Sequence, residues 1–164
     1  MDAPRGSSSA TASRTDRASR VVEAAPEDVY AALVDPDALS RWLPPAGMRA
    51  EFERHDARPG GGYRMVLTYL DSAGSPGKST SDSDVVEARY VELEPGVRVV
   101  QEVQFESDDP AYAGTMTMTW ALEGVESGTR VEFRAEDAPP GISAEDHQVG
   151  LESSLRNLAT YLSR

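Results

Sequence analysis

Residues 115–122, TMTMTWAL, alternate large apolar side chains with small ones along the whole stretch. Successive side chains of an extended chain point to opposite faces, so Met116, Met118, Trp120 and Leu122 share one face. The threonines and the alanine share the other face. This alternation predicts a strand of an antiparallel sheet that is buried on one face only. The buried face requires a covering element, and the flanking sequence determines what that element is.

The same two-residue period recurs on both sides of this strand. Apolar and polar residues alternate between turns that contain glycine or proline, which is the pattern of successive strands. The predicted strands cover residues 48–53, 63–69, 85–93, 97–105 and 131–135. Because the turns between them are short, the strands are expected to form an antiparallel meander.

The chain ends with the longest predicted helix. Ser143 and Asp146 form a capping box at its start, with the Ser143 hydroxyl placed to accept from the backbone near Asp146. Four leucines then recur at helical spacing and give the helix a single apolar stripe. These residues are Leu151, Leu155, Leu158 and Leu162.

Two short helices are predicted between a first strand at Val21 and the meander. Pro26 stands at the first helical position of one helix, and proline favours that position. This helix ends before Pro36, because a residue that precedes proline disfavours the helical region. The second helix contains Leu39 and Trp42 and ends at the two prolines that follow.

These elements together predict a single α+β domain at residues 18–164, preceded by a flexible polar tail at residues 1–17. The two short helices are too small to cover the apolar face of the sheet, so the leucine stripe of the terminal helix is expected to cover it. A curved antiparallel sheet wrapped around one long C-terminal helix encloses a space. The size of the inward side chains determines whether that space is packed or hollow.

Composition excludes several classes of partner. The formal net charge of the 164-residue chain is -12, and such a surface repels nucleic acid and anionic membranes. The chain contains no cysteine, which excludes disulfides and thiolate metal sites. Its start has no apolar region typical of a signal peptide, and no apolar stretch approaches the roughly 20 residues that span a bilayer. We therefore expect a cytoplasmic protein that binds neither nucleic acid nor membrane.

Standard catalytic and cofactor motifs are missing from the sequence. There is no Gly-x-Ser-x-Gly elbow, no His-Glu-x-x-His and no phosphate-binding loop. The run Gly60-Gly61-Gly62 leads into a strand and not into a helix, so it predicts a turn and not a phosphate site. No carboxylates or histidines have metal-ligand spacing. The sequence therefore predicts no catalytic residue, no metal and no cofactor.

The chain has two histidines, His55 and His147. His55 lies in a charged run at residues 53–56 and is expected to be exposed to water. His147 lies one helical turn before Leu151 on the inward face of the terminal helix. It could contact a ligand or act as a general acid or base. The alternative is a partly exposed residue whose ring nitrogens bond to water or to a backbone group. The sequence assigns no orienting carboxylate to it.

The inward face of the predicted sheet combines large aromatic rings with flexible thioethers. This mixture is common in pockets for flat or hydrophobic ligands, and it is also compatible with a packed core that contains no cavity. The residues concerned are Tyr63, Met65, Tyr69, Met116, Met118 and Trp120. Gln101 lies among inward valines, and its buried amide needs a partner, which is a ligand, Tyr69 or a water molecule.

Five short motifs resemble one known family in their order and spacing. The opening helix carries APEDVYAAL at residues 25–33, followed by Asp35-Pro36, and the second helix carries Leu39 and Trp42. The other three motifs are Arg58-Pro59-Gly60-Gly61 before a strand, Gly128-Thr129-Arg130 before the last strand, and Gly150 with Leu155 and Leu158 in the terminal helix.

With these motifs, the order of elements resembles the helix-grip fold of the START-like, or SRPBCC, superfamily, which includes polyketide cyclase-like proteins. The branch that it resembles is named after the C-terminal domain of the heat-shock-protein-90 ATPase activator. That family usually places Trp directly after the helix glycine, whereas this chain has Leu151. The resemblance covers residues 18–164 and implies a cavity between the sheet and the terminal helix.

We therefore expect a protein that binds a small hydrophobic or aromatic molecule and is not an enzyme. One alternative is a polyketide cyclase-like or hydrolytic enzyme that uses His147 with Tyr63 or Tyr69. Another is a co-chaperone-like domain whose partner is a chaperone. The chain is expected to be a monomer or a homodimer. The predicted ligand-binding residues are Trp42, Tyr63, Met65, Tyr69, Gln101, Met116, Met118, Trp120, His147 and Leu151.

Overall fold

The computed structural model describes residues 14–44, 48–69, 83–105 and 114–163. Its helices and strands follow the predicted order. They are β1 (Thr15–Val22), α2 (Pro26–Val34), α3 (Pro36–Trp42), β2 (Met48–Asp56), β3 (Gly62–Tyr69), β4 (Ser83–Glu94), β5 (Arg98–Phe105), β6 (Met116–Val125), β7 (Gly128–Glu136) and α4 (Ala144–Leu162).

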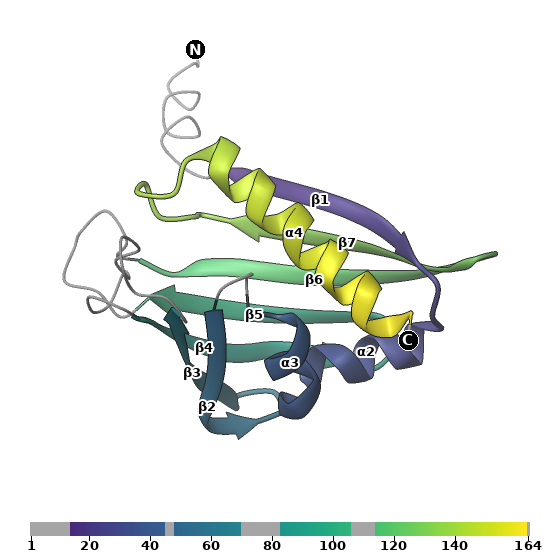
Figure 1. Ribbon diagram of the computed structural model, residues 1–164, viewed down its shortest axis with the longest axis horizontal. Helices are drawn as coiled ribbons and strands as arrows, with labels where there is room; N and C mark the ends of the chain where they lie inside the picture. The colour runs from purple at the N-terminus through teal and green to yellow at the C-terminus, as the bar shows by residue number, and fades with distance from the viewer. Residues whose placement is uncertain (1–13, 45–47, 70–82, 106–113, 164) are drawn as a thin grey trace, which may run out of the picture.

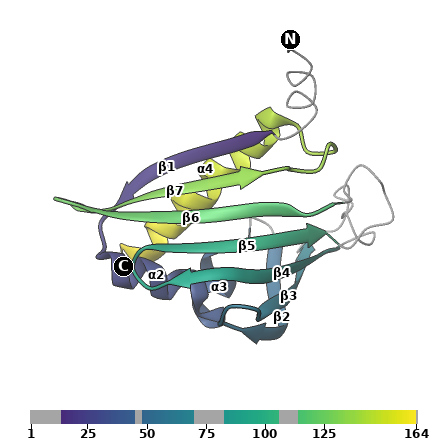
Figure 2. The same cartoon turned by 180° about the vertical axis from the view of Figure 1, so that it is seen from behind.

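The strands form one antiparallel sheet in the order β1-β7-β6-β5-β4-β3-β2. Figure 1 shows α4 crossing one face of the curved sheet, with α2 and α3 beside it on the same face. Seen from behind, the opposite face carries no helix among the described residues (Figure 2). This α+β arrangement confirms the predicted helix-grip fold.

The predicted helix boundaries are confirmed by their capping contacts. The Ser143 hydroxyl accepts from the backbone N–H of Asp146 at 3.0 Å and caps α4. Asp35 is the C-cap of α2 and also the N-cap of α3. Its carboxylate caps α3, because it accepts from the backbone N–H of Asp37 at 3.0 Å. These contacts satisfy backbone donors that the first turn of a helix leaves unpaired.

The core lies between α4 and the concave face of the sheet. Leu151, Leu155 and Leu158 are at most 2% exposed, and Leu162 at the last turn is half-buried. Trp120 of β6 stacks on Phe133 of β7 with ring centroids 3.5 Å apart. The leucine stripe therefore packs against the sheet as predicted but covers only part of it, and α2 and α3 cover another part (Figure 1).

The first strand begins earlier than the predicted domain boundary. The structure starts β1 at Thr15, whereas the sequence placed the tail at residues 1–17. Asp16 is only 7% exposed, and Thr15 pairs with Glu136 of β7. This segment carries no apolar marker because polar contacts hold this part of the strand. Residues 1–13 of the predicted tail lie outside the described residues.

A β-bulge in β2 corrects the prediction for His55. The pairing of β2 with β3 shifts between Phe52 and Arg54. Strict alternation from Phe52 places Arg54 on the inner face and His55 on the outer face. The extra residue reverses this, so His55 is half-buried and Arg54 is exposed. The expectation that His55 is exposed to water was wrong for this reason.

The glycine run before β3 forms the predicted turn and a close contact between strands. Gly60 has a φ of 86°, a conformation that glycine adopts without strain. At Gly62, a Cβ atom would lie 2.0 Å from the carbonyl oxygen of Ala88 in β4. No side chain fits at this separation without displacing the backbone of one strand.

We predict that Gly62→Ala lowers the free energy of unfolding by about 1–3 kcal/mol, because the new methyl group overlaps the Ala88 carbonyl. Urea denaturation of both proteins measures the difference. Gly150→Ala on α4 is the matched control, since no atom lies within 4 Å of its added Cβ. The control is expected to be neutral or up to about 1 kcal/mol more stable. Equal effects of the two substitutions would contradict the steric explanation.

Candidate functional site

A cavity of about 450 Å³ lies between the concave face of the sheet and the helices. Its volume is within the usual range for small-molecule sites. Strands β3 to β7 line one side, and α2, α3 and the first half of α4 line the other. The lining is mostly apolar. It consists of Leu33, Leu39, Leu43, Tyr63, Met65, Leu67, Val86, Gln101, Val103, Phe105, Met116, Met118, Trp120, Phe133, Gly141, Ile142, Asp146, His147, Gly150, Leu151 and Ser154.

The cavity reaches solvent near the start of α4. Gly141, Asp146 and Gly150 are the lining residues that are exposed, and all three belong to α4 or to the loop before it. Tyr63, Met65 and Trp120, on the strands opposite, are each at most 5% exposed. The site therefore has a buried apolar interior and an opening beside the first turns of α4.

Eight of the ten predicted ligand-binding residues line this one cavity. They are Tyr63, Met65, Gln101, Met116, Met118, Trp120, His147 and Leu151. Trp42 does not line it. The Trp42 side chain packs edge-on against Trp120 with centroids 5.5 Å apart, and its indole N–H donates to the Ala32 carbonyl at 2.9 Å. Trp42 thus supports the cavity wall from behind and is not at the entrance. The side chain of Tyr69 lies outside the described residues.

The buried amide of Gln101 has its partner inside the cavity. Its Nε2 donates to the Tyr63 hydroxyl at 3.3 Å, and both residues are nearly fully buried. Burial raises the pKa of Tyr63 above its ordinary value, although the hydrogen bond from Gln101 acts in the opposite direction. This pair gives the apolar interior one polar position, formed by β3 and β5.

His147 has a buried carboxylate partner that the sequence did not reveal. Its Nδ1 lies 2.8 Å from the Asp16 carboxylate, and the two side chains are 10% and 7% exposed. Arg14 approaches the same carboxylate oxygen with Nε at 3.1 Å and Nη2 at 3.0 Å. The carboxylate accepts from Nδ1–H, which leaves Nε2 as the ring nitrogen available to a ligand.

An aromatic cluster lies behind the Tyr63 side of the cavity. The His55 ring stacks on Tyr63 at a centroid separation of 5.8 Å, and His55 Nε2 is 3.3 Å from the Tyr90 hydroxyl. Burial lowers the pKa of His55, against the opposing effect of the Asp35 and Asp56 carboxylates. Burial also raises the pKa of Tyr90 far above its ordinary value. This cluster packs against Tyr63, and burial within it disfavours the charged form of His55.

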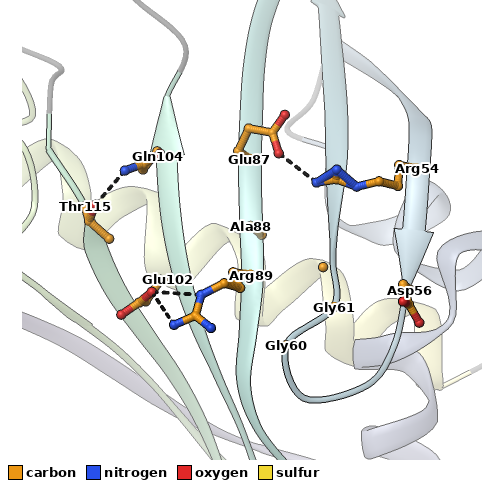
Figure 3. Close-up of a pocket in the computed structure, with 11 residues that line it drawn as sticks. Arg54, Asp56, Gly60, Gly61, Glu87, Ala88, Arg89, Glu102, Gln104 and Thr115 are labelled. Carbon is orange, nitrogen blue, oxygen red and sulfur yellow. Dashed lines mark hydrogen bonds and ion pairs between the residues drawn. The ribbon is translucent and has the colours of Figure 1, made fainter.

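A second hollow, of about 650 Å³, lies on the outer face of the sheet. Figure 3 shows charged side chains around it that pair with one another across the strands. Arg89 donates to Glu102 at 2.9 Å, and Arg54 donates to Glu87 at 2.8 Å. Because these charged groups already pair with one another, a ligand in this hollow would have fewer unpaired groups to bind.

The described residues contain neither a cluster suited to a metal ion nor a helix suited to a membrane. Among residues 14–44, 48–69, 83–105 and 114–163, no group of three or more His, Cys, Asp or Glu side chains is placed to hold a metal ion. In the same part of the chain, no helix is long and apolar enough to cross a membrane.

Residues 23–163 match the family described as Activator of Hsp90 ATPase homolog 1-like protein, and the chain belongs to this family. The match spans nearly all of the helix-grip domain, from the end of β1 to the end of α4. It confirms the resemblance that the sequence motifs indicated. No curated protein matches the chain.

Solved structures of similar proteins share the fold of this chain. Protein CV1439 from Chromobacterium violaceum is 34% identical, with a TM-score of 0.77 over 90% of this chain and 96% of that one. A protein from Rhodobacter sphaeroides is 23% identical, with a TM-score of 0.71 over 91% of each chain. DynU16, from the dynemicin biosynthetic locus, is 19% identical, with a TM-score of 0.65 over 91% of this chain and 47% of that one. The last two similarities establish the fold alone.

We predict that the stability of the protein depends on pH through His55. Its pKa in the folded state lies below the ordinary value of 6.5, so the unfolded chain takes up a proton first as the pH falls. The free energy of unfolding should therefore decrease between about pH 7.5 and about pH 5, and decrease less in His55→Phe. Urea denaturation at several pH values measures both slopes. Identical slopes would show that His55 is not held neutral by the fold.

Proposed function

We propose that this protein binds a small hydrophobic or aromatic molecule in the cavity beneath α4, and that it does so in the cytoplasm. The observation that carries the proposal is the mostly apolar cavity, which opens beside the first turns of α4. Methionines and aromatic rings line it, and one buried amide–phenol pair, Gln101 with Tyr63, adds polarity. Binding pockets typically combine an apolar lining with a few fixed polar groups in this way.

The side chains that line the site favour a flat ligand of modest size. Met116 and Met118 of β6 and Met65 of β3 supply flexible thioethers, which adapt to the edges of a ring system. Trp120 is stacked on Phe133, so that its ring forms a fixed wall. An apolar molecule that enters this space removes its own surface and that of the lining from water.

A thermal-shift screen with aromatic, polyketide-like and fatty compounds tests the proposal. A ligand at about 100 times its dissociation constant stabilises the folded state by about 2.7 kcal/mol. For a chain of this size we expect the melting temperature to rise by about 5–10 °C. Failure of every compound class to shift the melting temperature would contradict a binding function.

A pair of variants at Met118 tests whether the compounds bind in this cavity. Met118→Trp adds volume to the lining and is expected to weaken the binding of every hit at least about tenfold. Met118→Leu, which keeps the volume nearly constant, is the matched control and should bind normally. Titrations measure both, and cooperative melting shows that each variant is folded. Equal affinity of the two variants would place the ligand elsewhere.

An enzyme on the same fold is a second candidate, and one observation favours it. The Asp16 carboxylate orients His147, as a carboxylate does for a histidine that transfers protons. Tyr63 of the same cavity is available as a second proton-transferring group. Turnover of a compound found in the screen, lost in His147→Ala while binding is kept, would support this candidate over binding alone.

The family description favours a third candidate, a chaperone partner. Interaction with a chaperone requires an outer surface and makes no use of the apolar cavity. A chaperone ATPase assay with the purified protein distinguishes the two functions. Stimulation that persists in Met118→Trp, together with a failed ligand screen, would favour the chaperone over a small molecule.

A further inference from the structure

His147 lines the cavity and pairs with Asp16, and the apolar binding function does not explain this pair. Asp16 lies on β1, at one edge of the sheet, and His147 lies in the first turns of α4. The two residues are separated by 131 positions in the sequence, yet their side chains meet at 2.8 Å and are nearly buried. A ring that serves only to fill space does not need a buried carboxylate partner.

Among the described residues, His147 and Arg14 share one carboxylate. Arg14 neutralises Asp16, since its guanidinium lies 3.0 Å from the carboxylate. If His147 takes up a proton on Nε2, the carboxylate within ion-pair distance of it is Asp16, which already pairs with Arg14. Asp146 also lines the cavity, but its side chain is exposed and water weakens its effect. A negatively charged group inside the cavity supplies the missing charge.

We infer that the Asp16–His147 pair selects ligands with an acidic hydroxyl group, a phenol or a carboxylic acid, attached to an apolar body. This inference rests on the proposed binding function and specifies its ligand. The ligand hydroxyl donates to Nε2 of His147. As the proton moves to Nε2, the ligand oxygen keeps the electron pair of the broken O–H bond. The product is an anion beside an imidazolium whose other nitrogen donates to Asp16.

Proton transfer to His147 changes the ionisation of a bound phenol in the direction opposite to that expected from an apolar cavity alone. Transfer of a phenol from water into an apolar site favours its neutral form, because burial disfavours charge. If His147 accepts the proton, the bound phenol is instead more ionised than the free phenol at the same pH. The ionisation of a bound phenol therefore separates a proton-accepting pair from a merely structural one.

The probe that we choose is 4-nitrophenol, because its anion absorbs visible light and its neutral form does not. At a pH where the free probe is half ionised, we expect the anion-to-neutral ratio to rise about tenfold on binding. In His147→Phe, which keeps a ring in place, the ratio should fall below that of the free probe. Asp16 retains Arg14 as its partner in this variant, so the fold is not left with an unpaired buried charge.

Two charge variants test the part that Asp16 plays. Asp16→Asn should reduce the ionisation of the bound probe, because the imidazolium loses its carboxylate. Glu152→Gln makes the same change in charge at an exposed position of α4 that does not line the cavity, and it should leave the ratio unchanged. An equal loss in both variants would overturn the assignment to Asp16.

A comparison with 4-nitrotoluene, which carries a methyl group in place of the hydroxyl, separates failure of the inference from failure of the proposed function. Tighter binding of 4-nitrophenol than of 4-nitrotoluene, lost in His147→Phe, supports the inference. Equal affinities without a change in ionisation overturn the inference and leave the binding function intact. Absence of binding by both probes, with silence in the compound screen, overturns the two together.

Discussion

The structure depends on the packing of one helix against a sheet that is wider than the helix. Seven strands at a spacing of about 4.8 Å extend across roughly 29 Å, whereas a helix with its side chains is about 10–12 Å across. The buried stripe of Leu151, Leu155 and Leu158 therefore covers only part of the concave face. Helices α2 and α3 cover another part on the same face. The difference in width leaves the space that becomes the cavity, and the curvature of the sheet encloses it.

Patterns that repeat along the sequence allowed most of the fold to be predicted. The strand at residues 115–122, the leucine spacing of α4 and the Ser143 cap are local signals, and the structure contains all three. The burial of this strand departs from strict alternation at Thr119, which is 6% exposed although it lies on the outer face. The predicted lining followed from the same alternation, because residues on one face of neighbouring strands converge on one space. Trp42 departed from the prediction because a long-range hydrogen bond to Ala32 holds its indole behind the wall.

The remaining features depend on contacts that no local pattern records. The bulge between Phe52 and Arg54 moves every later residue of β2 to the opposite face of the strand. The sequence there is a run of charged residues, so no apolar pattern marks the shift. The meeting of Asp16 with His147 depends on the position of β1 beside β7, at the far edge from β2. The start of β1 looked like part of a tail because polar contacts, and not apolar ones, hold it in place. The polar contacts of the site therefore could not be predicted from the sequence and are seen only in the structure.

The strand order affects how the protein folds during its synthesis on the ribosome. The first strand to be synthesised, β1, pairs with β7, whose residues emerge more than 100 positions later. Until then β1 has no partner in the sheet, and α4, which covers part of the sheet, is made after all seven strands. The strands β2 to β6 expose their apolar face during this interval, when aggregation competes with folding. The cavity forms only after α4 has been made, so a nascent chain that stops before α4 has the strands that line the site but neither its covering helix nor the Asp16–His147 pair.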